Sequence, residues 1–172
     1  ILNICKKYKV FVVEDACMGI GAKVFKKKPG SFGHVNAFSM HPLKSLNVMG
    51  DGGMVVTNSL KIYKWLLKYR NHGMINRDYI DIWGVNMRLQ PLQAVVALEG
   101  IKKLNSTILK RNLNAKILDK NLKSLYPNVI LPERKKENLE TFALYMARFK
   151  QRDKLKTYLE KMLLPAIKNK NM

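Results

Sequence analysis

The sequence predicts an α/β fold: a sheet that includes parallel strands, then long helices, then the beginning of a smaller unit of strands and helices. Three observations carry this prediction. Short apolar runs near residues 10–13, 35–39 and 54–57 have the length of buried strands. Two later stretches repeat apolar residues every three or four positions, as amphipathic helices do. A final alternating stretch precedes one more helical pattern.

The first part of the chain predicts the strands. A polar, helix-compatible stretch at residues 3–9 leads into the apolar run Val10–Val13, which ends in Glu14 and Asp15. Because the run has no alternation, we expect a strand buried on both faces, as in a parallel sheet. A turn at Pro29-Gly30 follows, and Val35–Ser39 and Met54–Thr57 are the next two predicted strands.

Helical patterns dominate the middle of the chain. One begins at Ser59, repeats to Arg70 and ends at a glycine stop, residues 71–73. An irregular loop covers residues 74–89. Pro91 is placed at the first turn of the next helix, and a second helical run covers residues 108–125. Residues 140–149 then alternate like a strand, and residues 151–164 have a helical pattern.

Composition limits the class of protein. The chain has 172 residues, 47% of them hydrophobic, and lacks the run of ~20 apolar residues that a membrane span needs. Cys5 and Cys17 are too few for a disulfide framework and lack metal-ligand spacing, which favours a reducing, cytoplasmic setting and no metal site. The helix-to-strand pattern at the start and the helical pattern at the end favour a fragment of a longer protein.

The charge of the chain is strongly positive, +20, from 32 Lys and Arg against 12 Asp and Glu. The lysines are scattered, with one short run at residues 26–28, and no basic platform with interleaved aromatics accompanies them. Nucleic acid is therefore not the expected partner, whereas anionic ligands such as nucleotide diphosphates suit the charge. A non-catalytic basic binding module stays open as an alternative.

Asp15 and Lys44 form the most informative pair. One follows the first core strand and the other lies just past the second, so both side chains reach the same edge of the sheet. A carboxylate and a lysine facing one ligand crevice suit pyridoxal phosphate chemistry. There the lysine forms a Schiff base with the cofactor aldehyde, and the carboxylate keeps the pyridine nitrogen protonated.

Four ordered blocks carry a family resemblance: VVEDACMGIGA, GSFGHVNAFSMHPLKSLNVMGDGGMVVTN, RNHG and GVNMRLQPLQAVVAL. Together they resemble the DegT/StrS nucleotide-sugar aminotransferases, which have the aspartate-aminotransferase (type I) fold. The resemblance runs to about residue 125 and continues more weakly through ETFALYMARFKQRDKL. It implies that residues 1–104 are the later part of the cofactor-binding large domain. Residues 105–172 are then the connecting helix and the beginning of the small C-terminal domain.

The resemblance also implies roles for five residues. Lys44 falls on the Schiff-base lysine, and Asp15 falls on the partner of the pyridine nitrogen. Ser39 falls on the serine that hydrogen-bonds the cofactor phosphate. Asn86 matches an asparagine that reaches the cofactor phosphate of the neighbouring subunit, which implies a homodimer. Met18 stands where many members have a glutamine beside the cofactor, and this departure puts that amide contact in doubt.

Lys44 separates two branches of the family, because relatives that act as sugar dehydratases carry histidine at this position. A lysine favours transamination, with pyridoxal phosphate as cofactor, glutamate as amino donor and a nucleotide-linked keto-sugar as acceptor. Such a reaction belongs to surface polysaccharide or amino-sugar biosynthesis. An inactive chain that keeps the family sequence is the remaining alternative.

Overall fold

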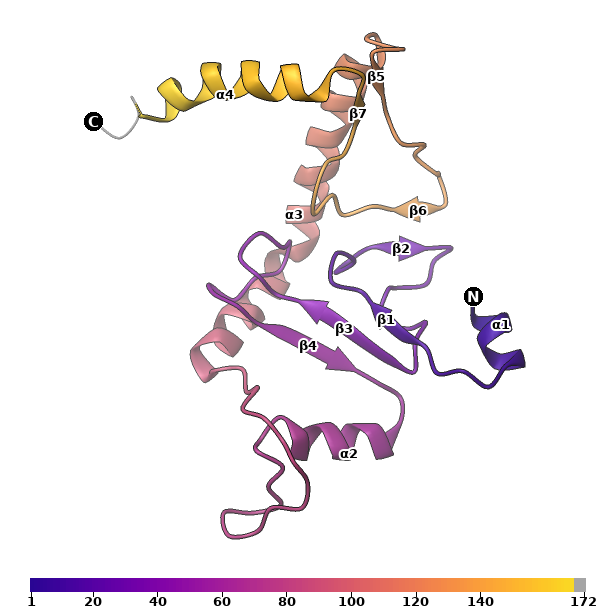
Figure 1. Cartoon of the computed structure of the whole chain (residues 1–172), viewed down its shortest axis with the longest axis vertical. Helices are drawn as coiled ribbons and strands as arrows, with labels where there is room; N and C mark the ends of the chain where they lie inside the picture. The colour runs from indigo at the N-terminus through magenta and orange to yellow at the C-terminus, as the bar shows by residue number, and fades with distance from the viewer. Residues whose placement is uncertain (169–172) are drawn as a thin grey trace. The chain divides into compact units, whose positions relative to one another are not determined.

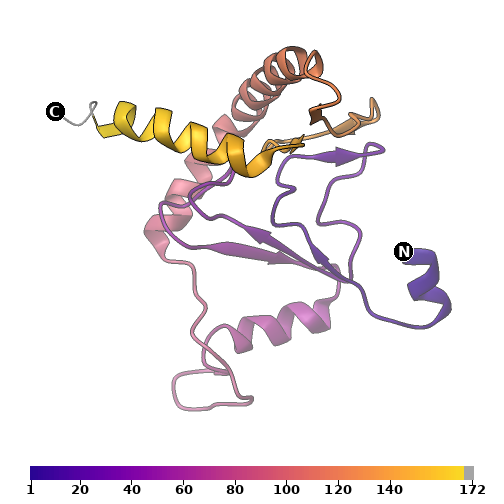
Figure 2. The same cartoon turned by 45° about the horizontal axis from the view of Figure 1, so that its top comes forward.

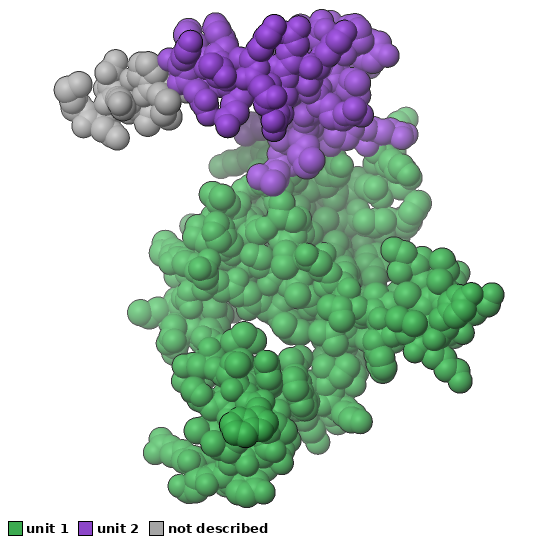
Figure 3. All heavy atoms as spheres, in the orientation of Figure 1, with its two compact units in different colours: residues 1–112, 135–143 green, residues 113–134, 144–172 purple. Residues whose placement is uncertain are grey.

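The computed structural model describes residues 1–168, which form two compact units (Figure 3). Unit 1 contains residues 1–112 and 135–143, and unit 2 contains residues 113–134 and the described residues from 144 onward. Figures 1 and 2 show the elements from two directions. In chain order they are α1 (Leu2–Lys7), β1 (Val13–Asp15), β2 (Lys23–Val24), β3 (Val35–Ser39), β4 (Gly53–Val56), α2 (Leu60–Tyr69), α3 (Pro91–Lys123), β5 (Val129–Ile130), β6 (Asn138–Leu139), β7 (Arg148–Phe149) and α4 (Arg152–Lys168).

A three-stranded sheet with the order β1-β3-β4 forms the centre of unit 1 (Figure 1). Strands β1 and β3 are parallel, with Asp15 opposite Ala37, and β3 and β4 are antiparallel, with Ser39 opposite Gly53. The predicted range of the second strand is confirmed, and the third lies one residue earlier than predicted. The carboxyl ends of β1 and β3 therefore meet at one edge of the sheet, as the sequence indicated.

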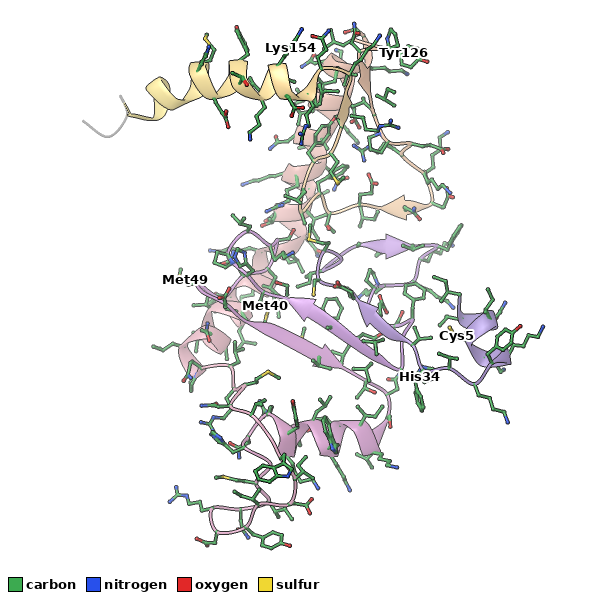
Figure 4. All side chains as sticks on the ribbon, viewed as in Figure 1. Cys5, His34, Met40, Met49, Tyr126 and Lys154 are labelled. Atoms are coloured by element: carbon green, nitrogen blue, oxygen red, sulfur yellow. The ribbon has the colours of Figure 1, made fainter. Side chains whose placement is uncertain are left out.

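The prediction of a doubly buried strand at Val10–Val13 is wrong. Of the four residues in this run, only Val13 belongs to β1. The Val13 side chain is 73% exposed, and Phe11 is 76% exposed. In the described part of the chain β1 pairs with β3 alone, so it is an edge strand with one open side. The preceding residues instead contact His34: Val12 N–H donates to His34 Nδ1 at 3.0 Å, and the ring of Phe11 meets the imidazole edge-on (Figure 4).

The core of unit 1 lies under the loop that follows β3. Met40, Leu46 and Val48 are buried against Ala97 of α3, and Ile20, Leu89 and Leu104 pack around them (Figure 4 labels Met40). The chain between Met40 and Val48 closes as a loop because Val48 N–H donates to the carbonyl oxygen of Met40 at 3.1 Å. Burial of three apolar side chains fixes this loop to the helix.

Helix α2 begins and ends where the sequence predicts. The Ser59 Oγ accepts a hydrogen bond from Ile62 N–H at 3.3 Å, which caps the first turn. Beyond the helix, Gly73 has φ +74°, and a Cβ at this position would lie 1.7 Å from the carbonyl oxygen of Ile82. Only glycine fits there, so the glycine stop is confirmed. Residues 74–89 form the irregular loop that we expected.

Two predictions for the later part of the chain need correction. The two helical runs after Pro91 form one continuous helix, α3. The strand expected at residues 140–149 is mostly wrong, since only its last two residues form a strand, β7, and the short β6 ends just before it. The carbonyl oxygens of Glu140 and Phe142 accept hydrogen bonds from Asn112 and Arg111 of α3, so side chains replace a strand partner.

In unit 2, a cluster of polar side chains joins α3 to the segments around it. The Asp119 carboxylate accepts from Arg134 Nε and Nη2, each at 3.3 Å, and from the Tyr145 hydroxyl at 2.6 Å. Burial raises the pKa of Asp119, but the hydrogen bonds from Arg134 and Tyr145 and the charge of Arg134 outweigh it, so the pKa lies below its ordinary value. The carboxylate is therefore charged at neutral pH.

Two features are absent from the described residues. No helix in this part of the chain is both long and apolar enough for a membrane crossing. Within the same residues, no three His, Cys, Asp or Glu side chains gather in a way that could hold a metal ion.

Candidate active site

Asp15 and Glu14, which are neighbours in β1, lie on opposite faces of the strand. Asp15 is exposed, whereas Glu14 is half-buried and holds the turn before β3. The Glu14 carboxylate accepts from the backbone N–H groups of Gly30 at 2.8 Å, Phe32 at 3.0 Å and Gly33 at 3.3 Å. Of the two acidic residues that the sequence placed at this edge, Glu14 is structural, and Asp15 is open to a ligand.

The Asp15 carboxylate is held by Cys17. The backbone N–H of Cys17 donates to Asp15 Oδ1 at 3.0 Å. Hydrogen bonds from the Cys17 thiol and backbone, together with the positive charge of Lys44, lower the pKa of Asp15 below its ordinary value. In return, the hydrogen bond with Asp15, burial and the Asp15 charge raise the pKa of the Cys17 thiol. Asp15 is thus an ionised carboxylate with a fixed orientation.

Lys44 lies on the loop that the core anchors. Its backbone N–H donates to the carbonyl oxygen of His41 at 2.9 Å, which closes a turn after Pro42. The Lys44 ammonium donates to Met18 Sδ at 2.6 Å. Since Met18 follows β1 and Lys44 follows β3, this contact bridges the two strand ends. The structure therefore brings Met18 and Lys44 into contact, at the end of the sheet where Asp15 is the last residue of β1.

Ser39 is the last residue of β3, at the same edge of the sheet. Its Oγ accepts a hydrogen bond from His41 N–H at 3.3 Å, so the serine also shapes the turn that leads to Lys44. The side chain is half-buried. Its place at the strand end agrees with the position that the sequence gave it.

Asn86 lies in a different part of unit 1. It is exposed, forms an isolated antiparallel bridge with Asn71, and its neighbour Met87 donates its N–H to the carbonyl oxygen of Arg70 at 2.9 Å. The bridge holds the loop of residues 74–89 against the end of α2. No recorded contact joins Asn86 to Lys44 within the described residues of this chain.

Three further residues shape the site and were not found from the sequence. Cys17 orients Asp15, as described above. The Thr141 hydroxyl, which is buried, donates to the carbonyl oxygen of Met18 at 3.3 Å. Arg111 reaches from α3 to the carbonyl oxygen of Leu43, next to Lys44, at 3.4 Å. Arg111 lies outside the quoted motifs, and Thr141 lies in the weakly matching stretch that starts at Glu140, so no local signal marks either side chain as part of the site.

A family model that matches residues 1–168 describes the DegT/DnrJ/EryC1/StrS aminotransferase family. The chain belongs to this family. The match covers both units and confirms the resemblance carried by the four sequence blocks.

Three of the curated relatives that resemble the chain have names that include a nucleotide-linked sugar. The chain is 40% identical to a UDP-N-acetyl-3-dehydro-alpha-D-glucosamine 3-aminotransferase of Acidithiobacillus ferrooxidans, over 56% of this chain and 26% of the relative. It is 32% identical to GDP-perosamine synthase of Escherichia coli O157:H7, over 73% of this chain and 35% of the relative. It is 30% identical to dTDP-3-amino-3,4,6-trideoxy-alpha-D-glucose transaminase of Streptomyces venezuelae, over 92% and 41%.

Solved structures confirm the predicted fold class. A DegT DnrJ EryC1 StrS aminotransferase from Brucella abortus has a TM-score of 0.85 and 32% identity, over 93% of this chain and 42% of that one. DesV of S. venezuelae, solved in complex with a ketimine intermediate, has a TM-score of 0.86 and 30% identity, over 93% of this chain and 43% of that one. The chain spans less than half the length of these relatives.

Proposed function

We propose that the protein is a pyridoxal-phosphate-dependent aminotransferase that transfers an amino group from glutamate to a nucleotide-linked keto-sugar. The observation that carries this proposal is that Asp15 lies at the carboxyl end of β1 and Lys44 follows that of the parallel strand β3, with the Lys44 side chain in contact with Met18, three residues after Asp15. Family membership supports it, because the solved relative DesV holds a ketimine intermediate.

The side chains present fit pyridoxal phosphate by their chemistry. When bound, this cofactor supplies an electron-accepting ring and an aldehyde that reacts with amines. The ionised Asp15 is suited to a protonated ring nitrogen, and the amine of Lys44 to the aldehyde carbon. The Ser39 hydroxyl is suited to the phosphate group. Met18 has no amide group, and its thioether lies against Lys44 instead, which makes it an apolar contact at the cofactor.

Lys44 has a second task in this proposal. An amine that can leave the cofactor and remain beside it is able to carry a proton between the substrate carbon and the cofactor carbon. The turn from Ser39 to Lys44 and the buried residues on either side of it keep the Lys44 backbone at the sheet edge, and the half-buried lysine side chain contacts Met18. A fixed backbone with the amine beside the end of β1 suits both tasks.

The decisive experiment compares the parent protein with Lys44→Ala. Purified parent mixed with pyridoxal phosphate should develop the visible absorbance of covalently bound cofactor, and borohydride should fix that cofactor on the peptide containing Lys44. Lys44→Ala should lose both signals. Lys23→Ala is the matched control, because Lys23 is an exposed lysine of β2. A visible band that survives in Lys44→Ala would overturn the assignment.

The substrate class rests on the relatives. Their names include UDP-, GDP- and dTDP-linked sugars, so the shared feature is a sugar attached to a nucleoside diphosphate. The positive charge of the chain suits such a ligand. We propose a role in surface polysaccharide or amino-sugar biosynthesis and, since Cys5 and Cys17 are both free thiols, a cytoplasmic location. Formation of 2-oxoglutarate from glutamate with a nucleotide keto-sugar tests the reaction.

We also propose that the site is completed by a second copy of the chain. Trp83, Val85 and Met87 flank Asn86, and Trp83 is 97% exposed. Exposed apolar side chains on either side of an amide suit a loop that inserts into a partner subunit. Trp83→Asp should shift the protein to a smaller species in analytical ultracentrifugation, and Tyr79→Asp, in the same loop, is the control. An unchanged species would count against this interface.

A further inference from the structure

Residues 135–143, distant in sequence from the candidate site, support its two loops: the loop after β1, which carries Met18, and the loop after β3, which carries Lys44. Residues 135–143 return to unit 1 after the chain has passed through part of unit 2. Their strand β6 pairs with β2, Asn112 Nδ2 donates to the carbonyl oxygen of Glu140 at 2.9 Å, and the Thr141 hydroxyl donates to the carbonyl oxygen of Met18 at 3.3 Å. The loop that carries Met18 is thereby held by residues 135–143 through its backbone.

Arg111 connects this returning segment to the other loop. Its Nη1 donates to the carbonyl oxygens of Phe142 at 2.7 Å and Ala143 at 3.3 Å, and its Nη2 donates to the carbonyl oxygen of Leu43 at 3.4 Å. The planar guanidinium presents donors in fixed directions, so one side chain spans two backbone segments. Leu43 directly precedes Lys44, and its own side chain is 70% exposed and cannot anchor the loop by burial.

We propose that Arg111 is a positioning residue for Lys44. Met40 and Leu46 fix the loop on either side of the turn, but between them the Leu43 carbonyl is held by the guanidinium. Arg111 therefore fixes the position of the peptide group between Leu43 and Lys44, and with it the position of the Lys44 Cα. Because a small displacement of a reacting group costs a large factor in rate, the clamp controls how readily the amine meets a cofactor aldehyde. The inference rests on the proposed function for the role of the amine.

Two variants separate the geometry of the clamp from its charge. Arg111→Gln removes the charge and the fork of donors. Arg111→Lys keeps the charge but has a single nitrogen, which can bond to the Phe142 end or to Leu43 but cannot span both. Lys110→Gln is the matched control, because Lys110 is the exposed neighbour on the same helix turn.

The experiment measures two quantities on the purified protein. The first is the rate at which pyridoxal phosphate is fixed by borohydride on Lys44, followed by peptide mass spectrometry. The second is hydrogen exchange of the backbone amides in residues 41–46 compared with β3 and β4. We expect Arg111→Gln to slow fixation at least about tenfold and to speed exchange in residues 41–46, with exchange in β3 and β4 unchanged. Arg111→Lys should keep parental exchange in β3 and β4 yet slow fixation by a smaller factor, and Lys110→Gln should match the parent.

Parental fixation rates in both Arg111 variants overturn the proposal. So does a loss of exchange protection that extends equally through β3 and β4, since this would mark Arg111 as a general stabilising residue. If Arg111→Gln does not fold, Arg111→Lys decides by the same criteria. If the parent itself takes no cofactor on Lys44, the proposed function fails, and the exchange of residues 41–46 still shows whether the clamp holds the loop.

Discussion

Replacing Glu14 by glutamine should destabilise unit 1 without touching the candidate site. The carboxylate accepts from Gly30 at 2.8 Å through one oxygen, and from Phe32 at 3.0 Å and Gly33 at 3.3 Å through the other. Glutamine keeps one acceptor oxygen and turns an NH₂ group toward the remaining donors. Gly33 N–H also donates to Asn36 Oδ1 at 2.7 Å, so it keeps a partner.

One backbone donor therefore loses its acceptor and faces the NH₂ group, and the bonds that remain are no longer charge-assisted. We expect a cost of about 2 kcal/mol in the free energy of unfolding. Urea unfolding followed by circular dichroism measures it, with an unchanged slope against urea showing that the folded state stays equally compact. Glu137→Gln is the control, because Glu137 is exposed. If the two variants differ from the parent by the same small amount, the three backbone contacts do not contribute as argued.

Two predictions concern the charged side chains. Because the hydrogen bond with Asp15, burial and the Asp15 charge raise the pKa of the Cys17 thiol, Asp15→Asn should move the pH profile of iodoacetamide alkylation at Cys17 to lower pH and leave Cys5 unchanged. An unmoved Cys17 profile would contradict the pairing. Folding lowers the pKa of Asp119 below its ordinary value of 3.8. Its contribution to stability is therefore complete above the ordinary pKa and is lost as the pH falls through the lower pKa of the folded state. Asp119→Asn should flatten the fall in urea midpoint between about pH 5 and pH 2, and a fall as steep as in the parent would rule the carboxylate out as its source.

Local signals predicted the elements that local chemistry decides. Ser59 as a helix cap and Gly73 as a stop need only their own turn, and both were predicted. The sites of Asp15 and Lys44 at one edge of the sheet followed from strand order. Their functional roles came from the family resemblance and stay predictions, as do the roles of Met18, Ser39 and Asn86 and the domain boundary at residues 104/105.

Features that depend on distant partners could not be predicted. The apolar run Val10–Val13 predicted a strand buried on both faces. Apolar content does not show how many strands lie beside a given strand, so the prediction failed. At Gly53 a Cβ would meet the Phe38 carbonyl oxygen at 2.8 Å, so the neighbouring strand requires the small residue, which the sequence of β4 alone does not show. The bonds of Arg111 likewise depend on a segment that returns from elsewhere in the chain.

The brace formed by residues 135–143 has a consequence for the order of folding. The Thr141 hydroxyl and its acceptor on Met18 are 123 residues apart in the chain, and Arg111 and Leu43 are 68 apart. Contacts between such distant residues close large loops, which makes them slow to form, whereas α2 and the β3–β4 pair depend on near neighbours. During synthesis, the strands β1 and β3, which lead to Asp15 and to the loop of Lys44, are complete long before Thr141 is made. Because the sheet forms early and the contacts of residues 135–143 form late, the loops that carry Met18 and Lys44 reach their final positions near the end of folding.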